Sequence, residues 1–165
     1  MNSIASTPRS AHRPQPLVMV EMIFPNATNH YGTLFGGKVL DLMDRAAFLA
    51  ATRFSNQMMV TASTEHIDFL VPVKSGHLVE LIAEVVFTGR TSLTVRVDLF
   101  SEDAIAKSRE HASQGYFHMV SVDAQGSPIA VPALLIRNEV EQSEWDYVTK
   151  LREFRKSHTP RPFSH

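Results

Sequence analysis

The sequence predicts an α+β fold in which one long antiparallel sheet covers a single apolar helix. Residues 38–54 contain no glycine or proline and place apolar side chains at helical spacing. After this helix, strand-like stretches separated by turn residues follow one another along the chain. An antiparallel sheet of this kind needs one covered face. Because the helix at 38–54 is the only long apolar helix in the sequence, we expect the sheet to wrap around it.

The helix has one apolar face and one acid at the margin of that face. Residues 17–24 form a β-rich run that stops at Pro25, and a loop rich in turn formers leads into the helix. A helical projection places an apolar stripe along Val39, Leu42, Met43, Ala46 and Ala50. Asp41 falls opposite this stripe and is expected to be a solvated surface acid. Asp44 falls at its edge, so we expect a carboxylate held against apolar surface.

Four long strands are expected after the helix, followed by a short strand and a second helix. The long strands are expected at 58–73, 77–89, 91–103 and 114–128, the short strand at 133–137, and the helix at 139–157. In the second long strand, one face is expected to carry Val79, Leu81, Ala83, Val85 and Phe87. A sheet with one covering helix leaves edges exposed, and pairing of two such sheets would protect them.

Composition restricts the possible functions. The chain has 165 residues, which is enough for one domain, expected at 16–156 between a disordered leader at 1–15 and a disordered tail at 157–165. The formal net charge of −1 indicates no nucleic-acid partner. No apolar run is long enough to insert across a membrane. The absence of cysteine excludes a Cys nucleophile and fits a cytoplasmic protein, and the eight histidines form no metal-binding motif, so no metal site is expected.

Three stretches of the chain resemble the hot-dog acyl-CoA thioesterases of the YciA and BACH type. The first, at 25–44, carries an asparagine, a glycine pair and an aspartate in the family's order, as Thr28-Asn29, Gly32, Phe35-Gly36-Gly37 and Met43-Asp44. The second, at 60–73, resembles the family's second strand, which ends in F-x-x-P. The third, at 89–100, resembles the turn and strand at the family's CoA-binding edge. The chain departs from the pattern at His30, Tyr31 and Lys38, which bears on acyl-chain preference.

The resemblance implies hydrolysis of an acyl-CoA to a fatty acid and CoA, with no cofactor. Asp44 would be the general base or the nucleophile, and Asn29 would orient the attacking water or the thioester. In this family the two residues of one site come from different protomers, which implies a homodimer, assembled further into a trimer of dimers, that is, a hexamer. The residues alone favour a different interpretation, in which Asp44 is a helix acid paired with an arginine such as Arg45 or Arg90, and Asn29 is a turn or cap residue.

The start of the helix is the expected oxyanion site. Backbone N–H groups are free at a helix N-terminus, and glycine at Gly36 and Gly37 would let a carbonyl oxygen approach them closely. The alternative is that the two glycines serve only a tight loop or close packing. A hydroxyl on the strand beside the helix would assist, and the candidates are Thr61, Ser63 and Thr64.

The CoA phosphates require cations or hydroxyl donors. The resemblance assigns Arg90, Thr91 and Ser92 to the CoA-binding edge, and Lys74 lies in a turn from which it would reach a phosphate. The alternative is that all four are solvated turn residues.

Two other functions fit the same fold. A hot-dog hydratase acting on enoyl thioesters would use an Asp/His pair, for which His30 is a candidate, although the sequence has no D-x-x-x-x-H motif. A non-catalytic acyl-CoA-binding protein would need no base at all.

Overall fold

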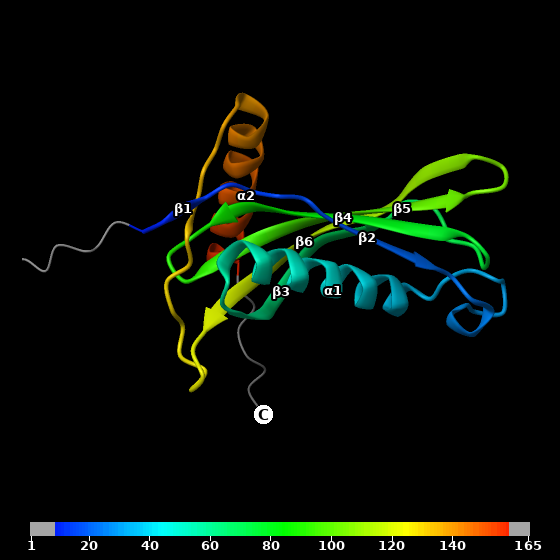
Figure 1. Cartoon of the computed structure of the whole chain (residues 1–165), viewed down its shortest axis with the longest axis horizontal. Coiled ribbons are helices and arrows are strands. Elements are labelled where there is room, and N and C mark those ends of the chain that lie inside the picture. Colours follow the sequence, from blue (N-terminus) through cyan, green and yellow to red (C-terminus); the bar gives the residue numbers. More distant parts are fainter. Residues whose placement is uncertain (1–8, 159–165) are drawn as a thin grey trace, which may run out of the picture.

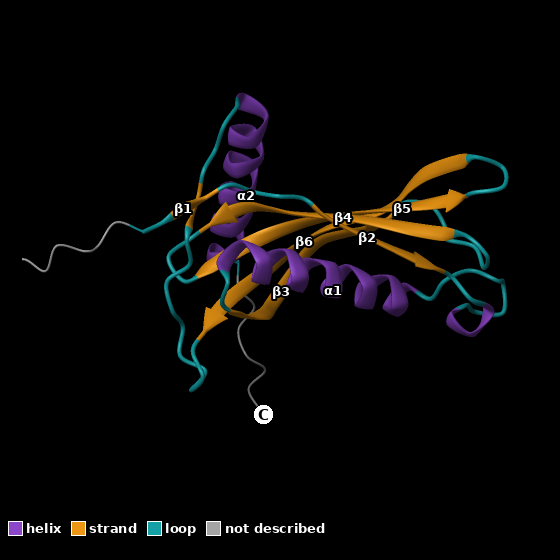
Figure 2. Cartoon of the chain, viewed as in Figure 1, coloured by secondary structure: helices purple, strands orange, loops and turns teal. Residues whose placement is uncertain are grey.

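The computed structural model describes residues 9–158, which form five long strands, two long helices and three short elements. In chain order the elements are β1 (Ala11–His12), β2 (Leu17–Met22), η1 (Pro25–Ala27), α1 (Gly36–Ser55), β3 (Met58–Phe69), β4 (Leu78–Thr88), β5 (Ser92–Asp103), β6 (Ser108–Val122), β7 (Ala133–Leu134) and α2 (Glu139–Ser157). Figure 1 shows their arrangement, and Figure 2 separates helices from strands by colour.

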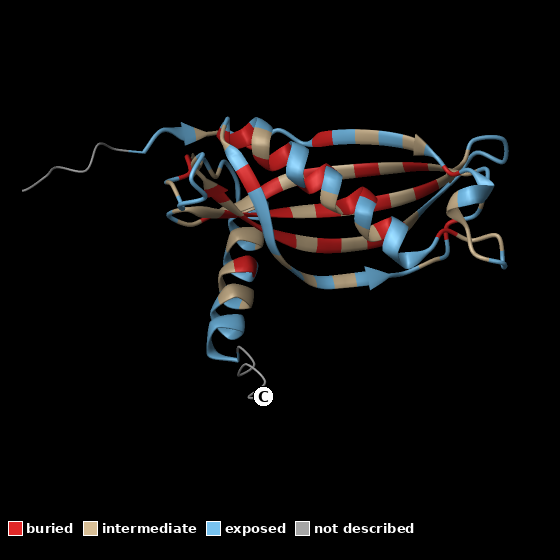
Figure 3. Ribbon diagram, turned by 90° about the horizontal axis from the view of Figure 1, so that it is seen from below, coloured by how far each residue is buried: buried red, intermediate tan, exposed pale blue. Residues whose placement is uncertain are grey.

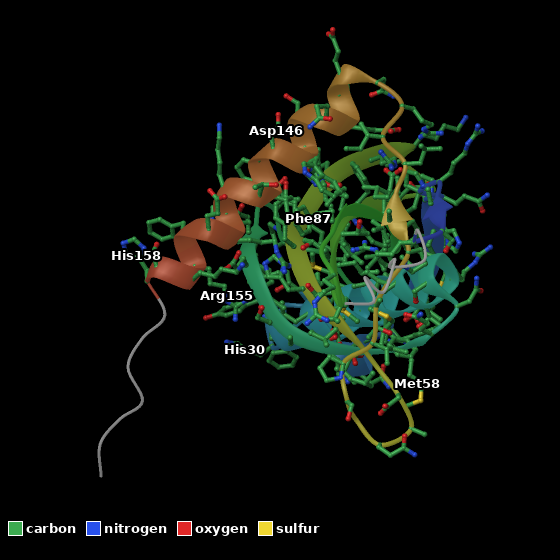
Figure 4. All side chains as sticks on the ribbon, turned by 90° about the vertical axis from the view of Figure 1, so that its left-hand side faces the viewer. His30, Met58, Phe87, Asp146, Arg155 and His158 are labelled. Atoms are coloured by element: carbon green, nitrogen blue, oxygen red, sulfur yellow. The ribbon has the colours of Figure 1, made fainter. Side chains whose placement is uncertain are left out.

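The long strands form one antiparallel sheet in the order β2-β4-β5-β6-β3. Helix α1 lies along one face of this sheet and contacts all five of its strands. In the end-on view of Figure 4, the sheet curves between α1 on its inner side and α2 on its outer side. The predicted architecture, a long antiparallel sheet wrapped around one helix with a second helix at the C-terminus, is confirmed.

The core lies between α1 and the inner face of the sheet. The predicted stripe of α1 is buried, and Met43 and Ala46 have no exposed surface. Opposite them, the central strands β4, β5 and β6 bury alternate residues, as Figure 3 shows. Of the two edge strands, β3 is mostly exposed, whereas β2 alternates between exposed and less exposed residues. The helix is therefore fixed to the middle of the sheet, and its margin lies near edge strand β3.

The prediction that Phe87 lies on the same face as Val85 is wrong, because β4 contains a β-bulge between these two residues. Val85 pairs with Val95 and Phe87 with Thr94, so one extra residue, Val86, lies between them. Because side chains alternate between faces, an extra residue turns the following side chain to the other face. Phe87 therefore leaves the inner row and packs on the outer face, where its ring lies 4.5 Å from that of Trp145 of α2.

The folded part of the chain extends beyond the expected domain, residues 16–156, at both ends. The expected leader spans residues 1–15, but within it Ala11–His12 pairs with β7 as a parallel strand, and the His12 ring is 2.7 Å from the Phe54 carbonyl oxygen. The folded part therefore begins before residue 16. Helix α2 continues to Ser157, the first residue of the expected tail. The rest of the leader and tail, residues 1–8 and 159–165, lies outside the described residues.

Strand boundaries also differ on either side of the core. β3 ends at Phe69, before the expected end at 73, and β6 begins at Ser108, six residues before the expected start. The extra length of β6 is polar and pairs with the end of β5. Only its last two residues, Ala112 and Ser113, are buried, so the segment shows no apolar alternation that periodicity would reveal. Neither described helix is long and apolar enough to cross a membrane.

Candidate active site

Asp44 lies half-buried on the margin of α1 and faces edge strand β3. The Thr61 hydroxyl donates a hydrogen bond of 2.7 Å to Asp44 Oδ1. Thr61 Oγ1 is also 3.3 Å from the sulfur of Met119 on β6. Within residues 9–158, no hydrogen-bond donor contacts the second carboxylate oxygen, Oδ2. The structure thus fixes the orientation of this carboxylate at the edge of the sheet.

The alternative in which Asp44 pairs with an arginine does not hold in this structure. Arg45 instead contacts Glu21 at 3.1 Å and Asp41 at 3.7 Å. Within residues 9–158, Asp44 forms no ion pair. Asp41, expected to be a solvated acid, is exposed and lies in this surface cluster.

Of the three candidate hydroxyls, Thr61 is the one that reaches Asp44. Thr61 pairs with Met119 and Ser63 with His118, so Ala62 is the extra residue of a bulge. The bulge turns Ser63 to the outer face, where its hydroxyl contacts Arg155 of α2. Thr64 is exposed, opposite Phe117 in the β3–β6 ladder.

Asn29 stabilises its own turn. Its Oδ1 accepts hydrogen bonds from the backbone N–H groups of Tyr31 (3.0 Å) and Thr33 (3.2 Å), and its Nδ2 donates to Thr33 Oγ1 (3.0 Å). Gly32, with a φ of 74°, makes this turn possible. The turn precedes α1, whereas Asp44 lies eight residues into the helix, about 12 Å along its axis. Asn29 and Asp44 make no hydrogen bond to each other in the described chain.

Helix α1 begins at Gly36 without a capping side chain in the described structure. The N–H groups of Lys38 and Val39 both bond to the Phe35 carbonyl, but those of Gly36 and Gly37 precede the first helical bond. Neither glycine has a positive φ. A Cβ at Gly36 would lie 3.6 Å from the Phe69 ring, an ordinary contact, and one at Gly37 would meet no atom within 4 Å. Packing within a single chain therefore does not require glycine at either position.

The four candidate CoA-binding residues lie in two places. Arg90, Thr91 and Ser92 follow β4, whereas Lys74 precedes it and bridges to Thr33. β4 has 11 residues, so about 35 Å of strand separates the two ends. One protomer alone therefore does not bring Lys74 to the other three.

A polar network on the outer face was not identified from the sequence. His118, which is 4% exposed, contacts Glu65 Oε2 through Nε2 at 2.9 Å and Thr94 Oγ1 through Nδ1 at 2.8 Å. Burial lowers the pKa of His118, against the opposing effect of Glu65. Arg152 and Arg155 of α2 join the same network. His118 is therefore a buried, hydrogen-bonded residue of strand β6, and no sequence signal pointed to its partners.

Comparison with known proteins places this geometry in a family. Residues 31–106 match the family described as the thioesterase superfamily. The acyl-CoA thioester hydrolase YkhA of Bacillus subtilis, itself described as uncharacterized, is 34% identical over 125 residues, covering 76% of this chain and 73% of YkhA. An acyl-CoA hydrolase from Staphylococcus aureus, solved with butyryl coenzyme A and coenzyme A, superposes with a TM-score of 0.79 at 31% identity, covering 86% of this chain and 87% of that one.

Two further findings come from solved structures. A hexameric acyl-CoA thioesterase superposes with a TM-score of 0.82 at 34% identity, covering 86% of this chain and 91% of that chain. The Staphylococcus aureus hydrolase was also solved with alanine replacing an aspartate, an asparagine and a threonine, one at a time. The relatives, the solved structures and the sheet wrapped around α1 all agree: the chain belongs to the thioesterase superfamily, and it is a thioesterase with the hot-dog fold.

Proposed function

We propose that this thioesterase hydrolyses acyl-CoA to a free fatty acid and CoA, with Asp44 as the catalytic carboxylate. The observation that carries the proposal is the hydrogen bond from Thr61 to Asp44, which holds a half-buried carboxylate in one orientation at the sheet edge. The three residue types replaced in the Staphylococcus aureus hydrolase, an aspartate, an asparagine and a threonine, are those of Asp44, Asn29 and Thr61.

In this mechanism Asp44 accepts a proton from the attacking water. The water oxygen bonds to the thioester carbonyl carbon, the carbon–sulfur bond breaks, and the proton passes from Asp44 to the departing thiolate. A direct attack by Asp44 would reach the same products through an anhydride that water then hydrolyses. In either route the carbonyl oxygen gains negative charge, so the site needs hydrogen-bond donors at that oxygen.

The N–H groups of Gly36 and Gly37 are the proposed donors to that oxygen. They lie at the uncapped start of α1, where the helix dipole adds positive potential. Because a Cβ at Gly37 would meet no atom of residues 9–158 within 4 Å, glycine at this position leaves space for a ligand or a partner chain. A neighbouring cavity of about 290 Å³, lined by Gly36, Val39, Phe69, Leu70 and other mostly apolar residues, is the proposed site for the start of the acyl chain.

Gly37→Ala should lower kcat by about 100-fold while leaving the protein as stable as the wild type or slightly more stable. The added methyl group meets no atom of the chain and favours the helix, but it would occupy the space that the thioester needs. Thiol release and thermal melting measure the two effects. A Gly37→Ala protein with full activity would contradict the proposal that Gly37 belongs to the oxyanion site.

The site is proposed to be completed by a second protomer, which would supply Asn29 opposite Asp44. Edge strand β3 presents exposed apolar side chains, including Met58, Val60 and Phe69, and an unpaired backbone edge. Pairing of two β3 edges would cover both. By analogy with the hexameric thioesterases of similar structure, two-protomer units are proposed to assemble further into a trimer of dimers.

Four residues are proposed to contact CoA: Arg90, Thr91, Ser92 and Lys74. Because Lys74 lies far from the other three in one protomer, it is proposed to contact a different CoA molecule from the one that they contact. A cytoplasmic location stays a prediction.

The decisive experiment is thiol release from a panel of acyl-CoAs that differ in chain length. Turnover of at least one substrate, without added metal, is the expected result. Loss of the double bond of an enoyl-CoA without thiol release would instead identify a hydratase. Tight acyl-CoA binding without any turnover would identify a binding protein.

A further inference from the structure

Two β-bulges divide edge strand β3. The first has Ala62 as its extra residue, and the second lies between Glu65 and Asp68, where two residues of β3 lie opposite one residue of β6. Because an extra residue reverses the alternation of side chains between the two faces, the segment between the bulges presents Ser63 and Glu65 on the outer face. This segment, residues 63–65, is short, so contacts of its side chains contribute to fixing its position.

Helix α2 contacts β3 at this segment and at the second bulge. The guanidinium of Arg155 contacts the Ser63 hydroxyl, and its Nε lies 3.6 Å from Glu65 Oε1. Figure 4 shows Arg155 on the C-terminal part of α2. The Tyr147 hydroxyl of the same helix lies 3.2 Å from Nδ1 of His66, a bulge residue whose φ of 50° is unfavourable for any residue other than glycine. One helix therefore holds the outward side chains of the segment and the bulge that follows it.

Glu65 is also bonded to the sheet itself. Its Oε2 lies 2.9 Å from Nε2 of His118 on β6, and its side chain is only 16% exposed. Arg152 lies 3.3 Å from His118 Nδ1, and arginine can only donate, so Nδ1 accepts and Nε2 carries the ring proton that is donated to Glu65. Burial lowers the pKa of His118, which favours this neutral ring. Because a carboxylate with a partner on each oxygen is costly to displace, Glu65 stays on the outer face.

The first bulge links these outer contacts to the catalytic carboxylate. Thr61 directly precedes Ala62 and faces inward, where its hydroxyl donates to Asp44 at 2.7 Å. A bulge bends its strand and re-aims the neighbouring side chains. A register without this bulge would turn Ser63 and Glu65 toward α1 and take Glu65 away from both of its partners. The direction of Thr61 therefore depends on contacts that are made on the opposite face of the sheet.

We propose that α2 positions the catalytic pair through β3, with Arg155 and Glu65 as positioning residues that hold the bulge at Ala62 and so direct Thr61 toward Asp44. The proposal rests on the proposed role of Asp44 in acyl-CoA hydrolysis. Because Arg155 and Glu65 lie on the outer face, they act through Thr61 and not on the reacting atoms.

The first test measures kcat for thiol release in Arg155→Gln and Glu65→Ala. In each variant kcat should fall about threefold, a smaller loss than removal of the Thr61 hydroxyl itself should cause, while KM stays within about twofold. Arg109→Gln and Glu80→Ala are the matched controls, because they break an ion pair between β6 and β4 on the same outer face, away from the bulges. Both controls should keep kcat within about 1.5-fold of the wild type.

A double-mutant cycle separates positioning from a general loss of stability. In a Thr61→Val protein the hydroxyl is absent, so Arg155→Gln and Glu65→Ala should cause no further fall in kcat. The same threefold fall in both backgrounds, or single variants with unchanged kcat, would overturn the proposal. The Arg155 side chain is 45% exposed, so its substitution should leave the protein folded, which thermal melting verifies.

Amide hydrogen exchange tests the contacts between α2 and β3 without any turnover. Exchange in peptides that cover residues 58–69 should become about threefold faster or more in Arg155→Gln, whereas Arg109→Gln should leave it unchanged. Unchanged exchange in Arg155→Gln would overturn the proposal whether or not the protein hydrolyses acyl-CoA. Faster exchange in a protein whose wild type releases no thiol would support the hold of α2 on the bulge and contradict only the proposed function.

Discussion

Replacing Asp44 by asparagine should lower kcat for acyl-CoA hydrolysis by about a thousandfold, with little effect on folding. Asparagine has the size of aspartate and still accepts the hydrogen bond from Thr61, but it cannot take a proton from water. The loss should therefore fall on kcat rather than KM. Thiol release at saturating substrate measures the first effect, and thermal melting verifies the fold.

Asp41→Asn is the matched control for this variant. Asp41 lies on the same helix, three residues earlier, and is exposed beside Arg45. The same chemical change there should leave kcat within about twofold of the wild type, because a surface ion pair contributes little. An Asp44→Asn protein with more than half the wild-type kcat would eliminate Asp44 as the catalytic carboxylate.

Thr61→Val should have an intermediate effect. It keeps the carboxylate and the shape of the side chain but removes the donor that orients Asp44. The loss of one hydrogen bond to a charged group corresponds to about a tenfold fall in kcat. Thr61→Ser, which keeps the hydroxyl, should restore most of the activity.

The second large effect is recovery of activity when two inactive proteins are combined. If Asn29 and Asp44 of one site come from different protomers, Asn29→Ala and Asp44→Asn are each inactive alone. In a mixed dimer, one site carries both substitutions and the other carries neither. Equal amounts after random reassembly should regain about a quarter of the wild-type activity, because half of the dimers are mixed and each has one intact site.

The physical basis of this prediction is the separation of the two residues within one protomer. Asn29 bonds to its own turn before α1, and Asp44 bonds to Thr61 two helical turns farther along. Reassembly of Asp44→Asn with Asp44→Ala, which leaves no intact site, is the control and should stay inactive. Mixed dimers that are verified by mass but remain inactive would show that each site belongs to a single protomer.

Periodicity was sufficient to predict the part of the fold that depends on burial. The stripe from Val39 to Ala50 and the alternation along β4 and β5 follow from the need of a helix and a sheet to bury one face each. The marginal position of Asp44 follows from the same helical geometry, and the structure confirms that it is half-buried. The roles of Asn29, Gly36 and Gly37 came from family resemblance and stay predictions.

Periodicity could not predict β-bulges, which add one residue to a strand, or the pairing of strands that are far apart in the sequence. The bulge at Val86 turns Phe87 outward, and the bulge at Ala62 places Thr61 and Ser63 on opposite faces, yet neither interrupts the hydrophobic pattern visibly. The parallel pairing of β1 with β7 joins segments that are more than 100 residues apart, counted from Ala11 to Ala133.

By itself, the sequence determined which face of each element is apolar, and therefore that one helix would lie inside one curved sheet with Asp44 at its margin. The tertiary structure alone decided which hydroxyl meets that carboxylate and that Arg152 is half-buried beside the hydroxyls of Ser92 and Thr94. The reason is physical. Burial is a property of each residue's own chemistry and spacing, whereas a hydrogen bond or an unbalanced charge depends on groups that only folding brings together.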